Sequence, residues 1–173
     1  MDLRSFVRDV PDFPKPGILF KDITPVLRDP HAFGYAIDRL TEPFWGKGID
    51  VVVGIEARGF LFGVPIAQRL GVGFVPVRKK GKLPYKKRAA TYALEYGFDT
   101  VEMHEDALKE GHHALVVDDL LATGGTAKAA IELVRGLGGK VTSCAFLIEL
   151  SFLEGREKLA PTEVVSLVKY EAE

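Results

Sequence analysis

Asparagine is absent from this sequence of 173 residues, and glutamine, cysteine and tryptophan occur once each. The single cysteine, Cys144, excludes an intrachain disulfide, and its apolar neighbours predict a buried, unreactive thiol. Scarcity of the thermolabile residues asparagine, glutamine and cysteine is typical of thermophilic proteins. We therefore expect a melting midpoint well above about 50 °C, which a thermal unfolding scan would check.

Long apolar runs and a strong net charge are also missing. No apolar stretch approaches the roughly 20 residues that a membrane-spanning helix needs. Residues 1–4 include two charges and do not resemble the apolar core of a secretion signal. The formal net charge of −1 provides no overall field that would attract nucleic acid or a membrane surface. We therefore expect a cytoplasmic protein with no nucleic-acid or membrane partner.

Apolar residues make up 47% of the sequence, which suffices for one globular domain over residues 1–173. Asp29 and Pro30 are typical of a helix start, and Pro43 of a helix end. Short apolar runs alternate with segments of helical spacing, which predicts an α/β fold with a central, mostly parallel sheet flanked by helices. Ligands of such sheets bind beyond the carboxyl ends of the strands. The expected strands are 51–55, 74–78, 114–117, 141–149 and 164–168, with further helices at 60–70 and 126–137.

A loop of small residues follows the strand expected at 114–117. Asp118 and Asp119 come directly after that strand, and two glycines then allow backbone amides to approach an anion at the start of the next helix. Two carboxylates would repel a lone phosphate, but they suit a ribose diol or Mg²⁺. The residues alone also fit a capped helix start with solvated acids. We call this loop the cup, because its backbone amides and hydroxyls are expected to bind phosphate. Its residues are Ala122, Thr123, Gly124, Gly125 and Thr126.

This run resembles the signature of type I phosphoribosyltransferases, which bind 5-phosphoribosyl-1-diphosphate (PRPP). The resemblance implies that the cup holds the 5′-phosphate and that Asp118 and Asp119 face the ribose hydroxyls. It also implies a hood at residues 1–30, a mobile hairpin loop at 79–97 and a homodimer. Mg²⁺ would accompany PRPP and reach Asp118 or Asp119, through water.

Two further segments are expected to bind the diphosphate. Residues 56–60 alone fit an ordinary strand-to-helix turn, but the resemblance makes Ala57 and Arg58 part of the diphosphate loop and implies a cis peptide bond between Glu56 and Ala57. The basic run 78–88 alone fits a solvated face, whereas the resemblance makes it part of the mobile loop. Residues 85–88 are more basic than expected of the family, which leaves loop closure and the response to salt open. The expected contacts from this run are Arg78, Lys79 and Lys82.

Residues 12–25 and 94–97 resemble the branch of the family that acts on adenine. The implied reaction is adenine plus PRPP giving AMP plus diphosphate, a step of purine salvage. Glu95 is the expected catalytic proton partner of the base, with Arg58 assisting the leaving group; from the sequence alone Glu95 also fits an exposed strand residue. The expected contacts with adenine are Leu19, Phe20, Lys21 and Leu150.

Three other functions stay open at this point. A related enzyme could act on xanthine, hypoxanthine or orotate, because the argument for adenine rests on the hood and Glu95. A non-catalytic PRPP sensor would ordinarily carry an additional DNA-binding domain. A metal-binding module would need ligand spacing that the histidines do not have. Those histidines are His31, His104, His112 and His113.

Overall fold

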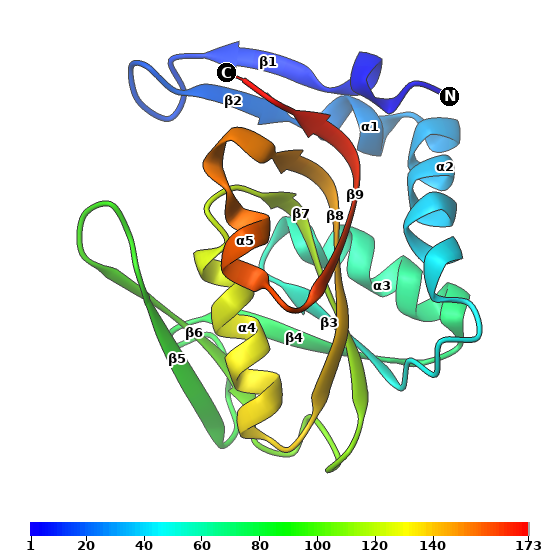
Figure 1. Cartoon of the computed structure of the whole chain (residues 1–173), viewed down its shortest axis with the longest axis vertical. Coiled ribbons are helices and arrows are strands. Elements are labelled where there is room, and N and C mark those ends of the chain that lie inside the picture. Colours follow the sequence, from blue (N-terminus) through cyan, green and yellow to red (C-terminus); the bar gives the residue numbers. More distant parts are fainter. Residues whose placement is uncertain (173) are drawn as a thin grey trace.

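The computed structural model describes residues 1–172 and has an α/β fold built on a seven-stranded sheet (Figure 1). The strand order is β5-β6-β4-β3-β7-β8-β9. Five strands are parallel: β3 (Val51–Ile55), β4 (Gly73–Lys79), β7 (His113–Leu121), β8 (Lys140–Leu150) and β9 (Glu163–Tyr170). An antiparallel hairpin of β5 (Lys87–Ala93) and β6 (Phe98–His104) completes one edge. The predicted fold class is confirmed.

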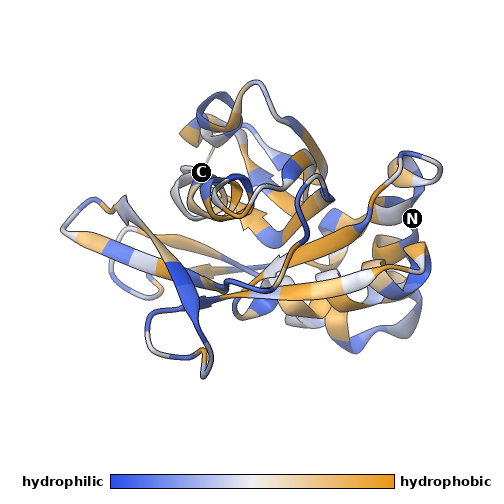
Figure 2. Cartoon of the chain, turned by 90° about the horizontal axis from the view of Figure 1, so that it is seen from below, coloured by the Kyte–Doolittle hydropathy of each residue, from blue (hydrophilic) through white to orange (hydrophobic). Residues whose placement is uncertain are grey.

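Helices cover both faces of the sheet and enclose two apolar cores. One core packs beneath α2 (Pro30–Thr41) and α3 (Arg58–Leu70), and the other beneath α4 (Gly125–Gly136) and the short α5 (Gly155–Leu159). Figure 2 shows apolar residues concentrated along the central strands. Within residues 1–172, no helix is long and apolar enough to cross a membrane. The smaller elements are α1 (Thr24–Arg28) and the 3-10 turns η1 (Leu3–Phe6), η2 (Glu42–Phe44) and η3 (Ser151–Leu153).

The start of α2 follows from its local sequence. The Asp29 side chain accepts hydrogen bonds from the amides of His31 and Ala32, at 2.9 and 2.8 Å. These bonds satisfy donors that a helix N-terminus otherwise leaves free. The helix ends at Thr41, two residues before Pro43, so both predicted boundaries are confirmed.

The acidic pair does not follow its strand, as the sequence pattern predicted, but lies within it. Strand β7 continues to Leu121, because β8 runs beside it and pairs Asp118 with Phe146. Cross-strand pairing outweighs the low strand propensity of aspartate. The helix after the cup begins at Gly125, one residue earlier than predicted. The carboxylates are therefore held by a rigid strand rather than by a loop.

Two hairpins frame the carboxyl end of the sheet. The hood hairpin pairs β1 (Arg8–Pro11) with β2 (Leu19–Asp22) and lies across the ends of β8 and β9 (Figure 1). The β5–β6 hairpin projects from the sheet edge and turns at residues 94–97, where the Leu94 amide donates to the Gly97 carbonyl at 2.9 Å. The sequence pattern placed a return strand at 91–96; the strand ends at Ala93, because the turn must reverse the chain before β6.

Candidate active site

The loop predicted to form the phosphate cup lies at the N-terminus of α4. Residues 121–127, with Asp118 and Leu120, surround a hollow of about 90 Å³. Gly124 has a φ of 83°, in the left-handed region that favours glycine. The first amides of α4 and the positive end of its dipole lie at this hollow, an arrangement that binds anions.

A cleft of about 370 Å³ adjoins the cup, and Asp118 and Thr126 line both. It brings together segments that are far apart in the sequence: the turn between β3 and α3, the end of β4, the hairpin and the end of β7. The cleft is therefore large enough for more than a phosphate and is lined by both acidic and basic side chains. Its lining residues are Ile55, Glu56, Ala57, Arg58, Val77, Lys79, Tyr92, Val101, Asp118, Asp119 and Thr126.

The two aspartates crowd negative charge into the cleft. Asp119 is only 4% exposed, and its Oδ2 lies 2.6 Å from Arg58 Nε. Burial raises the pKa of Asp118 well above its ordinary value, and the negative charge of Asp119 raises it further. Such a pair costs stability unless a cation or hydrogen-bond donor meets it. The cleft is therefore prepared for a ligand with hydroxyls or a metal ion.

Arg58 spans the cleft between Asp119 and the hood. Its guanidinium carbon lies 5.3 Å from the ring centroid of Phe20 in β2. The peptide bond between Glu56 and Ala57, just before Arg58, is cis, as predicted. Arg58 therefore contacts both Asp119 in the cleft and Phe20 of the hood hairpin.

The predicted basic contacts do not all face the cleft. Arg78 donates from Nε and Nη2 to Glu56 Oε1 at 3.2 and 2.6 Å, and the Lys79 amide donates to Glu56 Oε2 at 2.7 Å. Burial alone would raise the pKa of Glu56, but these bonds hold it below its ordinary value. Lys79 lines the cleft, whereas Lys82 lies in the exposed turn after β4. Arg78 therefore braces the turn that carries Arg58.

Sequence reasoning missed Tyr92, which lines the cleft from β5. Its hydroxyl donates to Asp99 Oδ2 at 3.3 Å, and a Cβ added to Gly125 would lie 3.1 Å from its ring. Burial raises the pKa of Tyr92 above its ordinary value, so the hydroxyl stays a donor near neutral pH. The alternation that places Ala90 and Tyr92 on one face of β5 was the available signal.

The structure does not bring Glu95 into the cleft. Its side chain is 76% exposed at the turn of the β5–β6 hairpin, where Oε2 lies 3.9 Å from Lys15 Nζ of the hood. Lys21 directs its side chain to Asp9, at 2.7 Å, and over the ring of Tyr170. The predicted contacts Leu19, Phe20 and Leu150 are half-buried near the ends of β2 and β8.

A fold of this topology with a phosphate cup beside paired carboxylates defines a phosphoribosyltransferase, and comparison with known proteins agrees. The family model described as the phosphoribosyl transferase domain matches residues 30–170, and the chain belongs to this family. Within it, the chain falls among the adenine phosphoribosyltransferases.

Three relatives illustrate the similarity. The adenine phosphoribosyltransferase of Nitrosococcus oceani is 57% identical over 168 residues, covering 97% of this chain and 98% of that protein. The crystal structure of the Thermoanaerobacter pseudethanolicus enzyme has a TM-score of 0.95 at 54% identity, covering 98% of both chains. The Saccharomyces cerevisiae enzyme, in a complex with adenine and an imino-altritol bisphosphate, has a TM-score of 0.90 at 46% identity and covers 95% of this chain and 96% of that chain.

Proposed function

We propose that this chain transfers the 5-phosphoribosyl group of PRPP to adenine and releases AMP and diphosphate, a reaction of purine salvage. One observation carries the proposal: the α4 cup adjoins a cleft lined by the two aspartates and Arg58, and the cup and the cleft share Asp118 and Thr126. The yeast relative, which was crystallised with adenine, supports the choice of base.

The cup would hold the 5′-phosphate of PRPP. Amides at the start of α4 and the hydroxyls of Thr123 and Thr126 are donors suited to the phosphate oxygens. Asp118 and Asp119 would accept hydrogen bonds from the two ribose hydroxyls, which replaces their mutual repulsion with favourable contacts. The ribose is then fixed with its anomeric carbon toward the wider cleft.

The diphosphate would leave toward Ala57, Arg58 and Lys79. Negative charge grows on this group as the bond to the ribose breaks, so positive side chains already held in the cleft stabilise the transition state. Arg78 acts through Glu56, because that pairing fixes the turn before Arg58. Lys82 would join the diphosphate when the basic turn moves over the cleft.

Mg²⁺ fits the donor set of this cleft if it arrives with PRPP. Within residues 1–172, no group of three or more His, Cys, Asp or Glu residues is arranged to hold a metal ion. Mg²⁺ commonly uses one or two carboxylates together with substrate phosphates and water. Asp118 or Asp119 would hold the ion through water, and the ion would neutralise charge on the diphosphate.

Adenine would bind between the hood and Leu150, with its edge read by backbone groups of Leu19 and Lys21. Glu95 would accept the ring proton from N7 as N9 bonds to the anomeric carbon of the ribose and the bond from that carbon to the diphosphate oxygen breaks. For this, the tip of the β5–β6 hairpin must fold from its exposed position onto the cleft, which also excludes water. Holding both reactants in place can supply about 7–11 kcal/mol of the barrier reduction.

We also propose that the enzyme is a cytoplasmic homodimer, in which residues of the basic turn reach the neighbouring active site. The turn between β4 and β5 supports this, because it is exposed and carries the positive side chains of Lys80, Lys82 and Lys86 on the surface. Light scattering should then give twice the 19.0 kDa mass of the chain.

Turnover of a panel of bases tests the proposed function. The purified protein, PRPP and Mg²⁺ are combined separately with adenine, hypoxanthine, xanthine and orotate. Adenine is expected to exceed each other base by roughly 10²-fold or more in kcat/KM, because a hydrogen-bonding edge discriminates strongly. A preference for another base would overturn the assignment of adenine, and PRPP binding without turnover of any base would favour a sensor.

The anchor of the hood gives a further prediction. Two cations lie over the ring of Tyr170: Lys21 Nζ is 4.0 Å from its centroid and the guanidinium carbon of Arg4 is 4.5 Å from it. Each such contact is worth about 0.5–2 kcal/mol. Tyr170→Leu is therefore expected to raise the KM for adenine roughly 2–30-fold and to leave that for PRPP unchanged. Tyr170→Phe keeps the ring and serves as the control; an equal rise in both KM values would contradict the prediction.

A further inference from the structure

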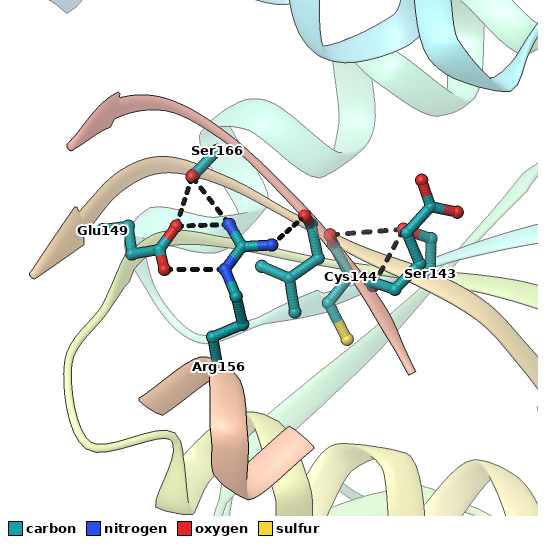
Figure 3. A network of polar contacts seen from close by, with 7 residues as sticks. Ser143, Cys144, Glu149, Arg156 and Ser166 are labelled. Atoms are coloured by element: carbon teal, nitrogen blue, oxygen red, sulfur yellow. Dashed lines mark hydrogen bonds and ion pairs between the residues drawn. The ribbon is translucent and has the colours of Figure 1, made fainter. Parts of the chain in front are cut away.

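A network of polar groups joins β8, α5 and β9 (Figure 3), and its residues line neither the cleft nor the cup. Glu149 in β8 is 3% exposed. Arg156 in α5 donates from Nε to Glu149 Oε1 at 2.9 Å and from Nη2 to Oε2 at 2.5 Å. Its Nη1 donates to the Val164 carbonyl at 2.6 Å. Ser166 Oγ in β9 donates to Glu149 Oε2 and accepts from Arg156 Nη2, so the network joins three elements.

A buried carboxylate paired with a half-exposed arginine needs a reason beyond stability. Removing a carboxylate from water costs several kcal/mol, and apolar side chains of similar volume often stabilise a protein as well or better. The forked contact between guanidinium and carboxylate instead fixes a direction and a distance. Bonds from Arg156 hold the pKa of Glu149 below its ordinary value, so the pair stays charged near neutral pH. The network therefore fixes the position of α5 relative to β8 and β9.

The first residue of α5 touches the phosphate cup directly. A Cβ added to Gly155 would lie 2.2 Å from the Ala122 carbonyl oxygen and 3.1 Å from the Gly124 amide nitrogen. A Cβ added to Gly124 would lie 2.8 Å from the Gly155 carbonyl oxygen. The Gly155 backbone therefore lies directly against the backbone of Ala122 and Gly124, with the Leu121 side chain beside it. Because Gly155 directly precedes Arg156, bonds that hold Arg156 also limit movement of Gly155 against the cup.

We propose that Glu149, Arg156 and Ser166 form a positioning clamp for the PRPP site. The clamp holds Gly155 against the back of the cup, so that the cup amides have their binding geometry before the phosphate arrives. Groups arranged in advance bind more tightly because no ordering cost is paid on binding. The inference rests on the proposed function of the cup as the 5′-phosphate site.

Steady-state kinetics of Arg156→Gln test the clamp, measured well below the melting temperature of the variant. The KM for PRPP is expected to rise roughly 10-fold or more, because the cup loses its support. The KM for adenine should stay within about twofold of the wild-type value. Arg156→Lys keeps the positive charge but cannot form the two parallel hydrogen bonds to Glu149, so its KM for PRPP should stay raised. Arg135→Gln, at an exposed arginine of α4, is the matched control and should change neither KM.

A purely structural role gives a different pattern. If Arg156→Gln lowers only the melting temperature and leaves the KM for PRPP within twofold, the clamp proposal is wrong; an equal rise of both KM values would also overturn it.

If that variant does not fold, Ser166→Ala removes a smaller part of the network and should raise only the KM for PRPP. Titration with ribose 5-phosphate separates this inference from the reaction: weaker binding by the variants supports the clamp even if the wild type forms no AMP, and unchanged binding refutes it.

Discussion

The Glu95→Ala variant is expected to turn over adenine roughly 10²–10⁴-fold more slowly than the wild type, which corresponds to about 3–5 kcal/mol of barrier. The loss should appear in kcat, because in the proposed mechanism the carboxyl group acts on the base during transfer. The variant should remain active above background, since the cup, the acids and Arg58 still position PRPP. Rapid-quench measurement of AMP formation would give the chemical step directly.

The position of Glu95 makes this a demanding test. In the structure its side chain is 76% exposed and 3.9 Å from Lys15 Nζ, outside the cleft. A role in proton transfer therefore requires closure of the β5–β6 hairpin. Glu105→Ala, at an exposed glutamate just after β6, changes charge on the same hairpin and should have little effect. Turnover of Glu95→Ala at the wild-type rate would remove Glu95 from the mechanism.

Asp118→Asn should produce the second-largest effect and the less intuitive one: activity falls while stability rises. A hydrogen bond to a charged group contributes about 1.5–3 kcal/mol, so kcat/KM should decrease roughly 10- to 150-fold. The melting temperature at pH 7 should increase, because the amide carries no charge that burial and the neighbouring Asp119 would disfavour. Active sites commonly carry a cost of this kind.

The pH dependence follows from the raised pKa of Asp118. The folded protein holds this proton more tightly than the unfolded chain, whose aspartate titrates near 3.8. The resulting stabilisation is complete below that value and is lost as the pH rises through the higher folded pKa. At neutral pH the folded wild type is therefore destabilised by Asp118, whereas the Asp118→Asn variant is not.

Thermal unfolding from pH 4 to pH 8 would check this difference. The gain in melting temperature of Asp118→Asn over the wild type should shrink toward pH 4. Asp106→Asn, at an exposed position between β6 and β7, should show no such trend. A variant that melts lower than the wild type at pH 7 would contradict the electrostatic argument.

Features set by nearby residues could be predicted from the sequence. The cap at Asp29, the buried strand Val51–Ile55 and the cup at 122–126 each depend on residue types within a few positions. Side-chain hydrogen bonding, apolar runs and glycine conformations act over this range. The gathering of Arg58 and the acids in one cleft followed from topology, because parallel strands end at one edge.

Contacts between distant segments could not be predicted in the same way. The basic run at 78–88 gave no sign that Arg78 pairs with Glu56, because this depends on the register of β3 and β4. Tyr92 reaches the cleft only because its hairpin packs against α4. The pairing of Glu149 with Arg156 depends on how the chain returns from β8 through α5. The local sequence does not distinguish these side chains from those of ordinary strand or surface residues; only the assembled sheet brings their partners near.

A crystal structure of the protein with AMP would test the central claim most directly. We predict that the phosphate accepts hydrogen bonds from the amides of residues 123–126 and that the ribose hydroxyls meet Asp118 and Asp119. The adenine should lie against residues 19–21, with Leu150 on its other side. A phosphate bound away from the cup, or a base that does not reach the hood, would contradict the proposed site and the reaction built on it.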